Sequence, residues 1–163
     1  MELGLTWPLQ RLLKTAVPYG EERDLRHCWD AHCITLHGRS SLLLVHSASR
    51  YTLVRFDMTP WDWKELQKIA GEEIRFGLEE AGLEAAAAEE IQFTRTHGRR
   101  PVAYLNRAWE DVLRWDVLVD RGSCRQPLLN RKINDIPCRC AWTEGQGSGR
   151  KFLLRCLTER KEQ

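Results

Sequence analysis

The chain has 163 residues, of which 42% are hydrophobic and 29% are charged, and its formal net charge is +2. These values are typical of a globular domain and exclude a disordered, fibrous or disulfide-stapled chain. No apolar run approaches the ~20 residues of a membrane helix, and the first residues show no secretory signal pattern. We therefore expect a cytoplasmic protein without membrane association, whose six cysteines are reduced thiols.

The first third of the chain predicts a strand, a helix and a meander. Residues 3–15 are expected to form the strand and the helix, with Thr6 as N-cap and Pro8 in the first turn. From Trp29 to Met58, three apolar runs alternate with two turns, which indicates a three-stranded antiparallel meander. The second and third runs are apolar at both odd and even positions, so both faces of this sheet need cover.

The middle of the chain predicts helices interrupted by one strand. Thr59, Pro60 and Asp62 are the residue types of a helix start, and this helix is expected to end at Gly82. Residues 91–96 alternate between apolar and polar and predict a half-buried strand. The solvated face of the helix that starts at Pro60 is expected to carry Glu72, Glu73, Glu79 and Glu80. Further helices are predicted over residues 84–90, 101–120 and 126–136.

The C-terminal quarter of the chain is basic. Residues 121–163 contain 10 Lys and Arg and 4 Asp and Glu, a net charge of +6, whereas the preceding residues have a net charge of −4. Residues 145–149 have the composition of a flexible linker, and residues 152–154 predict a last strand or a docking segment. We expect one α+β domain over residues 1–144, followed by a Gly-rich linker and a basic tail over residues 145–163. The tail either binds an acidic protein or a nucleic acid, or is simply solvated.

These elements predict an α+β fold in which helices pack on one face of an antiparallel sheet. The meander is the centre of this sheet, and the strand over residues 91–96 extends it. The second face is expected to be covered by the C-terminal segment or by a second copy of the chain, which would make a homodimer.

Several short motifs carry a resemblance to a known family. In chain order they are the opening LTWPLQRLLK, Trp29, the strand pair SLLLVHSASRYTLVRF, Thr96-x-x-Arg99, Asn106 and LLNRKINDIP. Over residues 3–140 the chain resembles a family of small bacterial domains of unknown function. The resemblance implies an α+β domain and supplies no activity. The chain departs from the family pattern at residues 7–9, which lack a common basic residue, and at His32 and His46, where Asn is common.

Basic side chains gather near two predicted strand turns and suggest an anion site. Helix N-termini and Arg side chains bind phosphate, and Pro101 starts a helix beside a basic turn that Arg107 also approaches. The alternative is that these arginines only keep strand ends soluble. The candidate anion-binding residues are Arg50, His97, Arg99, Arg100 and Asn106.

Two clusters of cysteine suggest a weaker candidate, a zinc site. Zinc takes four tetrahedral ligands, often from two close pairs, and His27 and His32 lie beside two of the cysteines. Neither spacing is the usual Cys-x2-Cys, so the competing interpretation is that the cysteines are buried apolar residues and the protein has no cofactor. The weak metal candidates are Cys28, Cys33, Cys138 and Cys140.

Three functions remain open from the sequence. Seven tryptophans among arginines would suit nucleic-acid stacking, but Trp63 and Trp109 lie in apolar helical stripes, which leaves Trp61 and Trp142 as candidates for exposure. No motif of nucleophilic catalysis, phosphate-loop binding or known nucleic-acid domains is present. We therefore expect a non-enzymatic binding or interaction module with a basic C-terminal surface, hypothetically an accessory protein of mobile DNA. The alternatives are a small enzyme for a phosphorylated or anionic substrate at the Arg/His/Asn site, and a nucleic-acid-binding protein.

Overall fold

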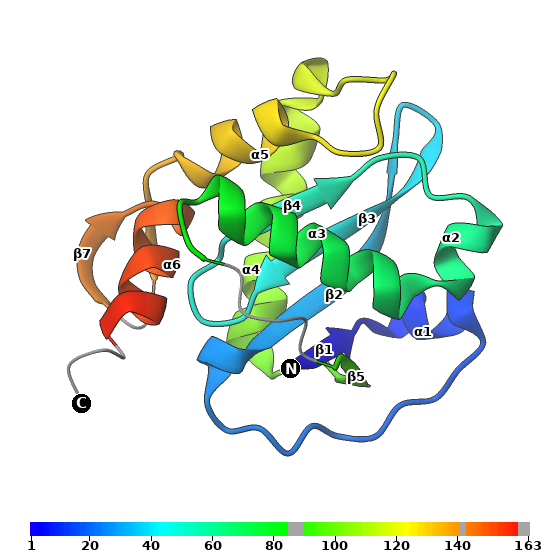
Figure 1. Ribbon diagram of the computed structural model, residues 1–163, viewed down its shortest axis with the longest axis horizontal. Coiled ribbons are helices and arrows are strands. Elements are labelled where there is room, and N and C mark those ends of the chain that lie inside the picture. Colours follow the sequence, from blue (N-terminus) through cyan, green and yellow to red (C-terminus); the bar gives the residue numbers. More distant parts are fainter. Residues whose placement is uncertain (85–89, 141–142, 160–163) are drawn as a thin grey trace.

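A mixed five-stranded sheet organises the protein, which is described by a computed structural model over residues 1–84, 90–140 and 143–159 (Figure 1). The strand order is β4-β3-β2-β1-β5, and the fold class is α+β. The strands of this sheet are β1 (Glu2–Leu5), β2 (Cys28–Leu36), β3 (Arg39–His46), β4 (Thr52–Arg55) and β5 (Gln92–Arg95).

Strands β2, β3 and β4 form the antiparallel meander that the sequence predicts. The register pairs Cys33 with Leu42 and Leu43 with Val54. The turn between β2 and β3 consists of His37 and Gly38, whose φ angles of 47° and 75° are both positive. Two positive φ angles are the signature of the tight hairpin turn whose twist matches that of the flanking strands.

Strands β1 and β5 make the sheet mixed, which corrects the prediction of an antiparallel sheet. β1 pairs in parallel with β2 on one side and with β5 on the other. The predicted strand over residues 91–96 therefore exists, but it joins β1 and not the meander. Apolar alternation reveals a strand and carries no information about the direction of its neighbour.

Helices cover both faces of the sheet, so the prediction of helices on one face is wrong (Figure 1). Leu42 and Leu44 belong to the core on the α3 side, whereas Leu43 and Val45 belong to the core on the α4 and α5 side. Because one chain supplies both covers, the reason for expecting a second copy disappears. None of the helices in the described ranges combines the length and apolar composition needed to cross a bilayer. The helices are α1 (Trp7–Leu13), α2 (Pro60–Lys64), α3 (Leu66–Glu80), α4 (Arg99–Arg114), α5 (Pro127–Asn134) and α6 (Gly149–Thr158), with short 3-10 turns at Leu25–His27 and Asp116–Leu118.

The helix predicted from Pro60 is divided into α2 and α3 at Glu65. Its start is as predicted, because Asp62 N donates to Thr59 Oγ1 at 3.1 Å and Thr59 N donates to Asp62 Oδ2 at 2.9 Å. The helix predicted over residues 84–90 lies mostly outside the described residues. Helix α4 ends at Arg114, before the predicted end near residue 120.

Glu73 is buried, although the sequence predicted it on the solvated face of α3. Its Oε1 lies 2.7 Å from Arg55 Nη1 on β4 and 3.5 Å from Arg125 Nε. Burial raises the pKa of Glu73, and the charge of Arg55 opposes that rise. A helical pattern shows which residues are apolar, and it does not show that an arginine on a strand will draw a glutamate inward.

The residues predicted to form a linker and a solvated tail form regular structure. Strand β7 (Thr143–Gly147) pairs antiparallel with β6 (Cys138–Cys140), and Ser148 caps α6 by accepting a hydrogen bond from Lys151 N at 3.3 Å. Phe152 and Leu153, which were expected in a strand or docking segment, are helical and fully buried. A run of three apolar residues does not distinguish a strand from a helix.

Two asparagine side chains of α5 complete the outer edge of β4. Asn134 Oδ1 accepts from Thr52 N at 2.8 Å, and Asn134 Nδ2 donates to Thr52 O at 2.7 Å. Asn130 Oδ1 accepts from Val54 N at 2.9 Å. Both asparagines are buried and belong to the LLNRKINDIP motif. They occupy the places that the backbone of a sixth strand would take.

Replacing Asn134 with Ala is expected to lower the free energy of unfolding by about 2–4 kcal/mol, because two buried backbone groups lose their partners. Asn130→Ala removes one such bond and is expected to cost about half as much. Urea denaturation followed by tryptophan fluorescence measures both. The exposed Asn106→Ala on α4 is the control, expected within about 0.5 kcal/mol of wild type; an Asn134→Ala value equal to this control contradicts the edge role.

Candidate functional site

An arginine-lined pocket of about 380 Å³ is the first candidate site. It is bordered by α4, by the end of α5, by β6 and by the turn between β3 and β4. Asp111 is the single carboxylate among its described lining residues, so the charged lining has a formal net charge of +3. The basic lining residues, from three separate segments of the chain, are Arg50, Arg107, Arg114 and Arg139.

Arg50 is held in place at the rim of this pocket. It has a left-handed backbone conformation, with φ at 68°, in the turn between β3 and β4. Its Nη1 donates to Arg139 O at 3.0 Å, and its guanidinium carbon lies 5.3 Å from the centre of the Tyr104 ring. A guanidinium has five N–H donors, so one bond to a carbonyl leaves Arg50 able to bind an anion as well.

Helix α4 supplies Arg107, Asp111 and Arg114 to one side of the pocket. Their spacing of four and three residues places them on the same face of the helix. Burial raises the pKa of Asp111, whereas the charges of Arg114, Arg50 and Arg107 act in the opposite direction. Asp111 therefore offsets only part of the positive charge around it.

The opposite wall of the pocket contains Cys138 and Gly149, the first residue of α6. Burial raises the pKa of the Cys138 thiol above its usual value. The thiol is therefore neutral near pH 7 and contributes shape and not charge. The positive charge of the pocket lining therefore comes from its arginines.

Arg50 is the one residue of the five anion-binding candidates that lines the pocket, together with Arg107 from the same predicted basic cluster. Arg99 and Arg100 are exposed in the first turn of α4, and Asn106 is exposed beside Arg107. His97 lies in a different environment, described below. Arg114 and Arg139 also line the pocket and are not among the predicted site residues. The spacing of residues 107, 111 and 114, which places them on one helical face, is the signal in the sequence that points to Arg114.

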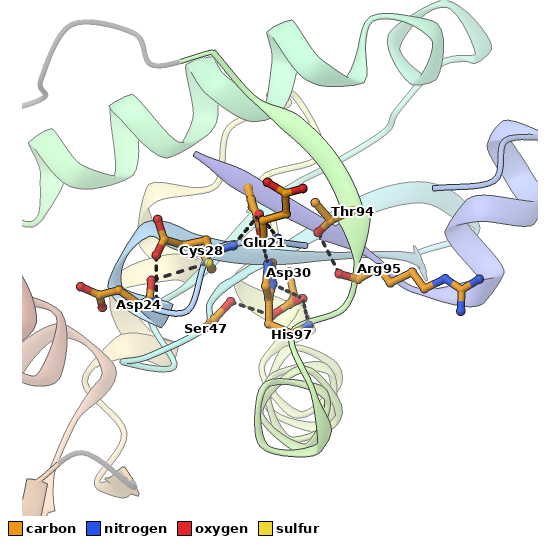
Figure 2. A network of polar contacts seen from close by, with 10 residues as sticks. Glu21, Asp24, Cys28, Asp30, Ser47, Thr94, Arg95 and His97 are labelled. Atoms are coloured by element: carbon orange, nitrogen blue, oxygen red, sulfur yellow. Dashed lines mark hydrogen bonds and ion pairs between the residues drawn. The ribbon is translucent and has the colours of Figure 1, made fainter. Parts of the chain in front are cut away.

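His97 belongs to a buried network of charged side chains next to the start of α4 (Figure 2). Its Nδ1 lies 3.0 Å from Asp30 Oδ1, and its Nε2 lies 2.9 Å from Glu2 Oε2. Asp30 Oδ2 accepts from the Ser47 hydroxyl at 2.7 Å, and Asp30 Oδ1 accepts from the backbone N–H of His97 at 3.1 Å. Both ring nitrogens of His97 thus face carboxylates of the same chain, which leaves neither directed toward an external anion.

The charges in this network stabilise one another. Burial disfavours the charged ring of His97, but hydrogen bonds to Asp30 and Cys28 and the charge of Asp30 outweigh burial and raise the pKa of His97 to about 11. Burial also acts to raise the pKa of Glu2, and hydrogen bonds from Glu22 N and His97 lower it overall. The two neighbouring carboxylates therefore favour the protonated form of His97.

Gly4 makes room for the network in the middle of β1. A Cβ atom at this position would overlap the carboxylate of Asp30 and would lie 2.8 Å from Thr96 Cα. Gly4 is paired with Asp30 on β2 and with Thr94 on β5, so the missing side chain leaves space between three strands. This is where the backbone passes from β5 toward His97.

The four cysteines predicted as metal ligands are not brought together. Cys138 lines the arginine pocket, and Cys140 is buried, with its Sγ donating to Ala48 O at 2.8 Å. Cys33 is half-buried against the core on the α3 side, whereas Cys28 is fully buried beside His97. The two predicted cysteine pairs therefore lie in separate environments.

The histidines considered with those cysteines have other partners. His32 Nδ1 lies 2.7 Å from Thr6 Oγ1. Because the Thr6 hydroxyl is engaged by His32, it does not cap α1, although Thr6 stands at the N-cap position as predicted. The His32 ring also packs edge-on against Trp109, with 5.2 Å between ring centres. His27 Nε2 lies 3.7 Å from Asp24 Oδ2.

The tryptophans follow the sequence prediction only in part. Trp63 is buried and Trp61 is 68% exposed, as predicted. Trp109 was expected in the core and is instead 36% exposed. Its ring packs against His32 and does not belong to either core cluster. Trp7 is also exposed, and Trp142 lies outside the described residues.

The family model described as "Domain of unknown function (DUF6933)" matches residues 2–149 of the chain. The chain belongs to this family. The DUF6933 match confirms the resemblance to an uncharacterised family, and no curated protein matches the chain. The matched range includes every residue of the arginine pocket and of the His97 network, so both belong to the DUF6933 domain itself.

His46, where the resemblance leads us to expect Asn, is buried. Its Nδ1 accepts from Ser49 N at 3.2 Å, so its Nε2 carries the proton that is donated to Arg26 O at 3.0 Å. Burial lowers the pKa of His46 to about 4. The fold therefore contains this histidine in its neutral form.

Acid is expected to destabilise the protein through His46. Because its folded-state pKa is below its usual value, neutral His46 stabilises the fold above about pH 6.5, and this contribution is lost as the pH falls through 4. His46→Asn is expected to reduce the loss of unfolding free energy between these pH values by on the order of 3 kcal/mol. Urea denaturation at several pH values measures the slope; identical slopes for variant and wild type would refute this origin of acid sensitivity.

Proposed function

We propose that this protein is a non-enzymatic binding protein that holds a small anion of the phosphate or carboxylate class in the arginine-lined pocket. One observation carries the proposal: four arginines from three segments of the chain converge on one concavity that contains a single carboxylate among its described residues. Arg139 also belongs to the basic C-terminal quarter, which supports the expectation of a basic binding surface.

The chemistry of the lining fits a compact, multiply charged anion. A guanidinium presents parallel N–H groups that match two oxygens of a phosphate or carboxylate. The pocket volume of about 380 Å³ lies at the lower end of the range for small-molecule sites. Four neighbouring arginines repel one another, and an anion between them relieves that repulsion.

The arrangement supports binding better than catalysis. An enzyme for an anionic substrate would need a titratable group that converges with the arginines on the substrate. His97, the predicted group of this kind, lies in the separate carboxylate network, and Cys138 in the pocket wall is neutral. The remaining candidate is Asp111, and no histidine or second carboxylate stands beside it among the described lining residues. The exposed Trp7 and Trp61 do not line the pocket, so nucleic-acid stacking at this site has no support from them.

Titration calorimetry with pyrophosphate and with citrate tests the proposal. Wild-type protein is expected to bind at least one of these probes, and Arg50→Gln and Arg107→Gln are each expected to weaken binding about tenfold or more, because a charged hydrogen bond is lost. Arg75→Gln is the matched control, since Arg75 is exposed on α3 and pairs only weakly with Glu79 at 3.4 Å.

Three outcomes would overturn the proposal. The first is no binding of either probe, and the second is an equal loss of affinity in Arg75→Gln. The third is tighter binding of a short single-stranded oligonucleotide with a steep salt dependence, which would favour the nucleic-acid alternative.

A further inference from the structure

We propose that Glu2, Cys28 and His97 form a binding site for zinc or a similar divalent transition-metal ion, with Asp30 as the group that orients His97. Each of the three residues offers one ligand atom, and these atoms all lie within 4.8 Å of one another. Among the described residues, no other group of three or more His, Cys, Asp or Glu side chains brings its ligand atoms this close together. It lies apart from the arginine pocket and is independent of the function proposed there.

The sheet itself places two of the three ligands side by side. Glu2 on β1 and Cys28 on β2 are direct partners in the parallel register, so their side chains project from the same face of the sheet. His97 reaches them from the segment between β5 and α4. Zinc bonds of about 2.0–2.3 Å place tetrahedral ligand atoms between about 3 and 4 Å apart, so small side-chain shifts suffice to seat an ion.

Asp30 provides a second observation that points to a metal. A histidine that binds zinc through one ring nitrogen commonly donates its other ring N–H to a carboxylate, which fixes the ring. His97 Nδ1 faces Asp30 Oδ1 at 3.0 Å (Figure 2). The opposite ring nitrogen, Nε2, is thereby directed toward Glu2 and Cys28. Asp30 is itself held by the Ser47 hydroxyl at 2.7 Å, and Gly4 leaves it the space it needs.

The donor set selects the kind of ion. One sulfur, one nitrogen and one carboxylate oxygen suit zinc and similar ions, and a buried thiol is a poor ligand for magnesium or calcium. The ion would replace the thiol proton of Cys28 and the Nε2 proton of His97. The net charge of the cluster would therefore be the same with the ion as with the two protons.

Three protein ligands leave a fourth position for water or a small ligand, as in zinc sites that are not purely structural. Access to this position is narrow, because the side chains of His97 and Glu2 are 5% and 10% exposed.

Cys28 distinguishes a metal site from an ion-pair cluster. The ion pairs that His97 makes with Glu2 and Asp30 do not pass through the thiol, which lies beside the His97 ring and also makes a long contact of 3.7 Å with Asp24 O. Removing the sulfur therefore leaves these ion pairs in place and takes away a metal ligand. Cys33, on the same strand and packed against the other face of the sheet, is the matched control.

The experiment uses the full chain purified without a histidine tag, stripped with a chelator and then loaded with Zn²⁺ or Co²⁺. Elemental analysis after desalting is expected to find about one equivalent of metal in wild type and in Cys33→Ala. The cobalt form of both is expected to show a thiolate-to-cobalt charge-transfer band. Cys28→Ala is expected to lose the band and to retain at least tenfold less metal, with an unchanged circular dichroism spectrum.

Two results would overturn the proposal. One is wild-type protein that retains no more metal than Cys28→Ala, and the other is a cobalt spectrum without a thiolate band. His97→Gln is a further variant, expected to lose the metal as well; because it also breaks a buried ion pair, Cys28→Ala decides the question if His97→Gln fails to fold.

Discussion

Strand β3 is apolar on both of its faces, and this constraint shapes the whole molecule. Side chains alternate between the two faces of a strand, so Leu42 and Leu44 require one cover and Leu43 and Val45 require another. Helix α3 provides the first cover, and α4 with α5 provides the second. Because α4 must lie on the sheet to bury Leu105 and Val112, its outer face is free to present arginines to solvent.

The two charged sites differ in the structural elements that carry their residues. The arginine pocket is lined by long side chains from a turn, a helix and a short strand, so its shape can adapt. In the second cluster, Glu2, Cys28 and Asp30 lie on the neighbouring parallel strands β1 and β2, and His97 follows β5. This cluster is almost completely buried. Rigid backbone holds its donors at fixed spacing, which suits an ion better than a variable organic ligand.

Local patterns predicted the elements, and distant pairings determined the sites. The meander, the Thr59–Asp62 cap and the helix at Pro127 follow from residues that are close in sequence. Arg50 meets Arg139 across 89 positions, and His97 meets Asp30 and Glu2 across 67 and 95 positions, distances over which periodicity carries no information. Glu2 lies just before the residues predicted to form the first strand, so its place in β1 beside Cys28 does not follow from the sequence pattern.

The asparagines of α5 limit how this protein can assemble with itself. A sheet grows where its outermost strand offers unpaired peptide groups to another chain, and edge-to-edge addition of this kind joins many dimers and most fibrils. At Thr52 and Val54 those groups are already bonded to Asn134 and Asn130. A pair of subunits could not continue its sheet through β4 unless α5 first moved away, so self-association at this border would have to use side-chain surfaces.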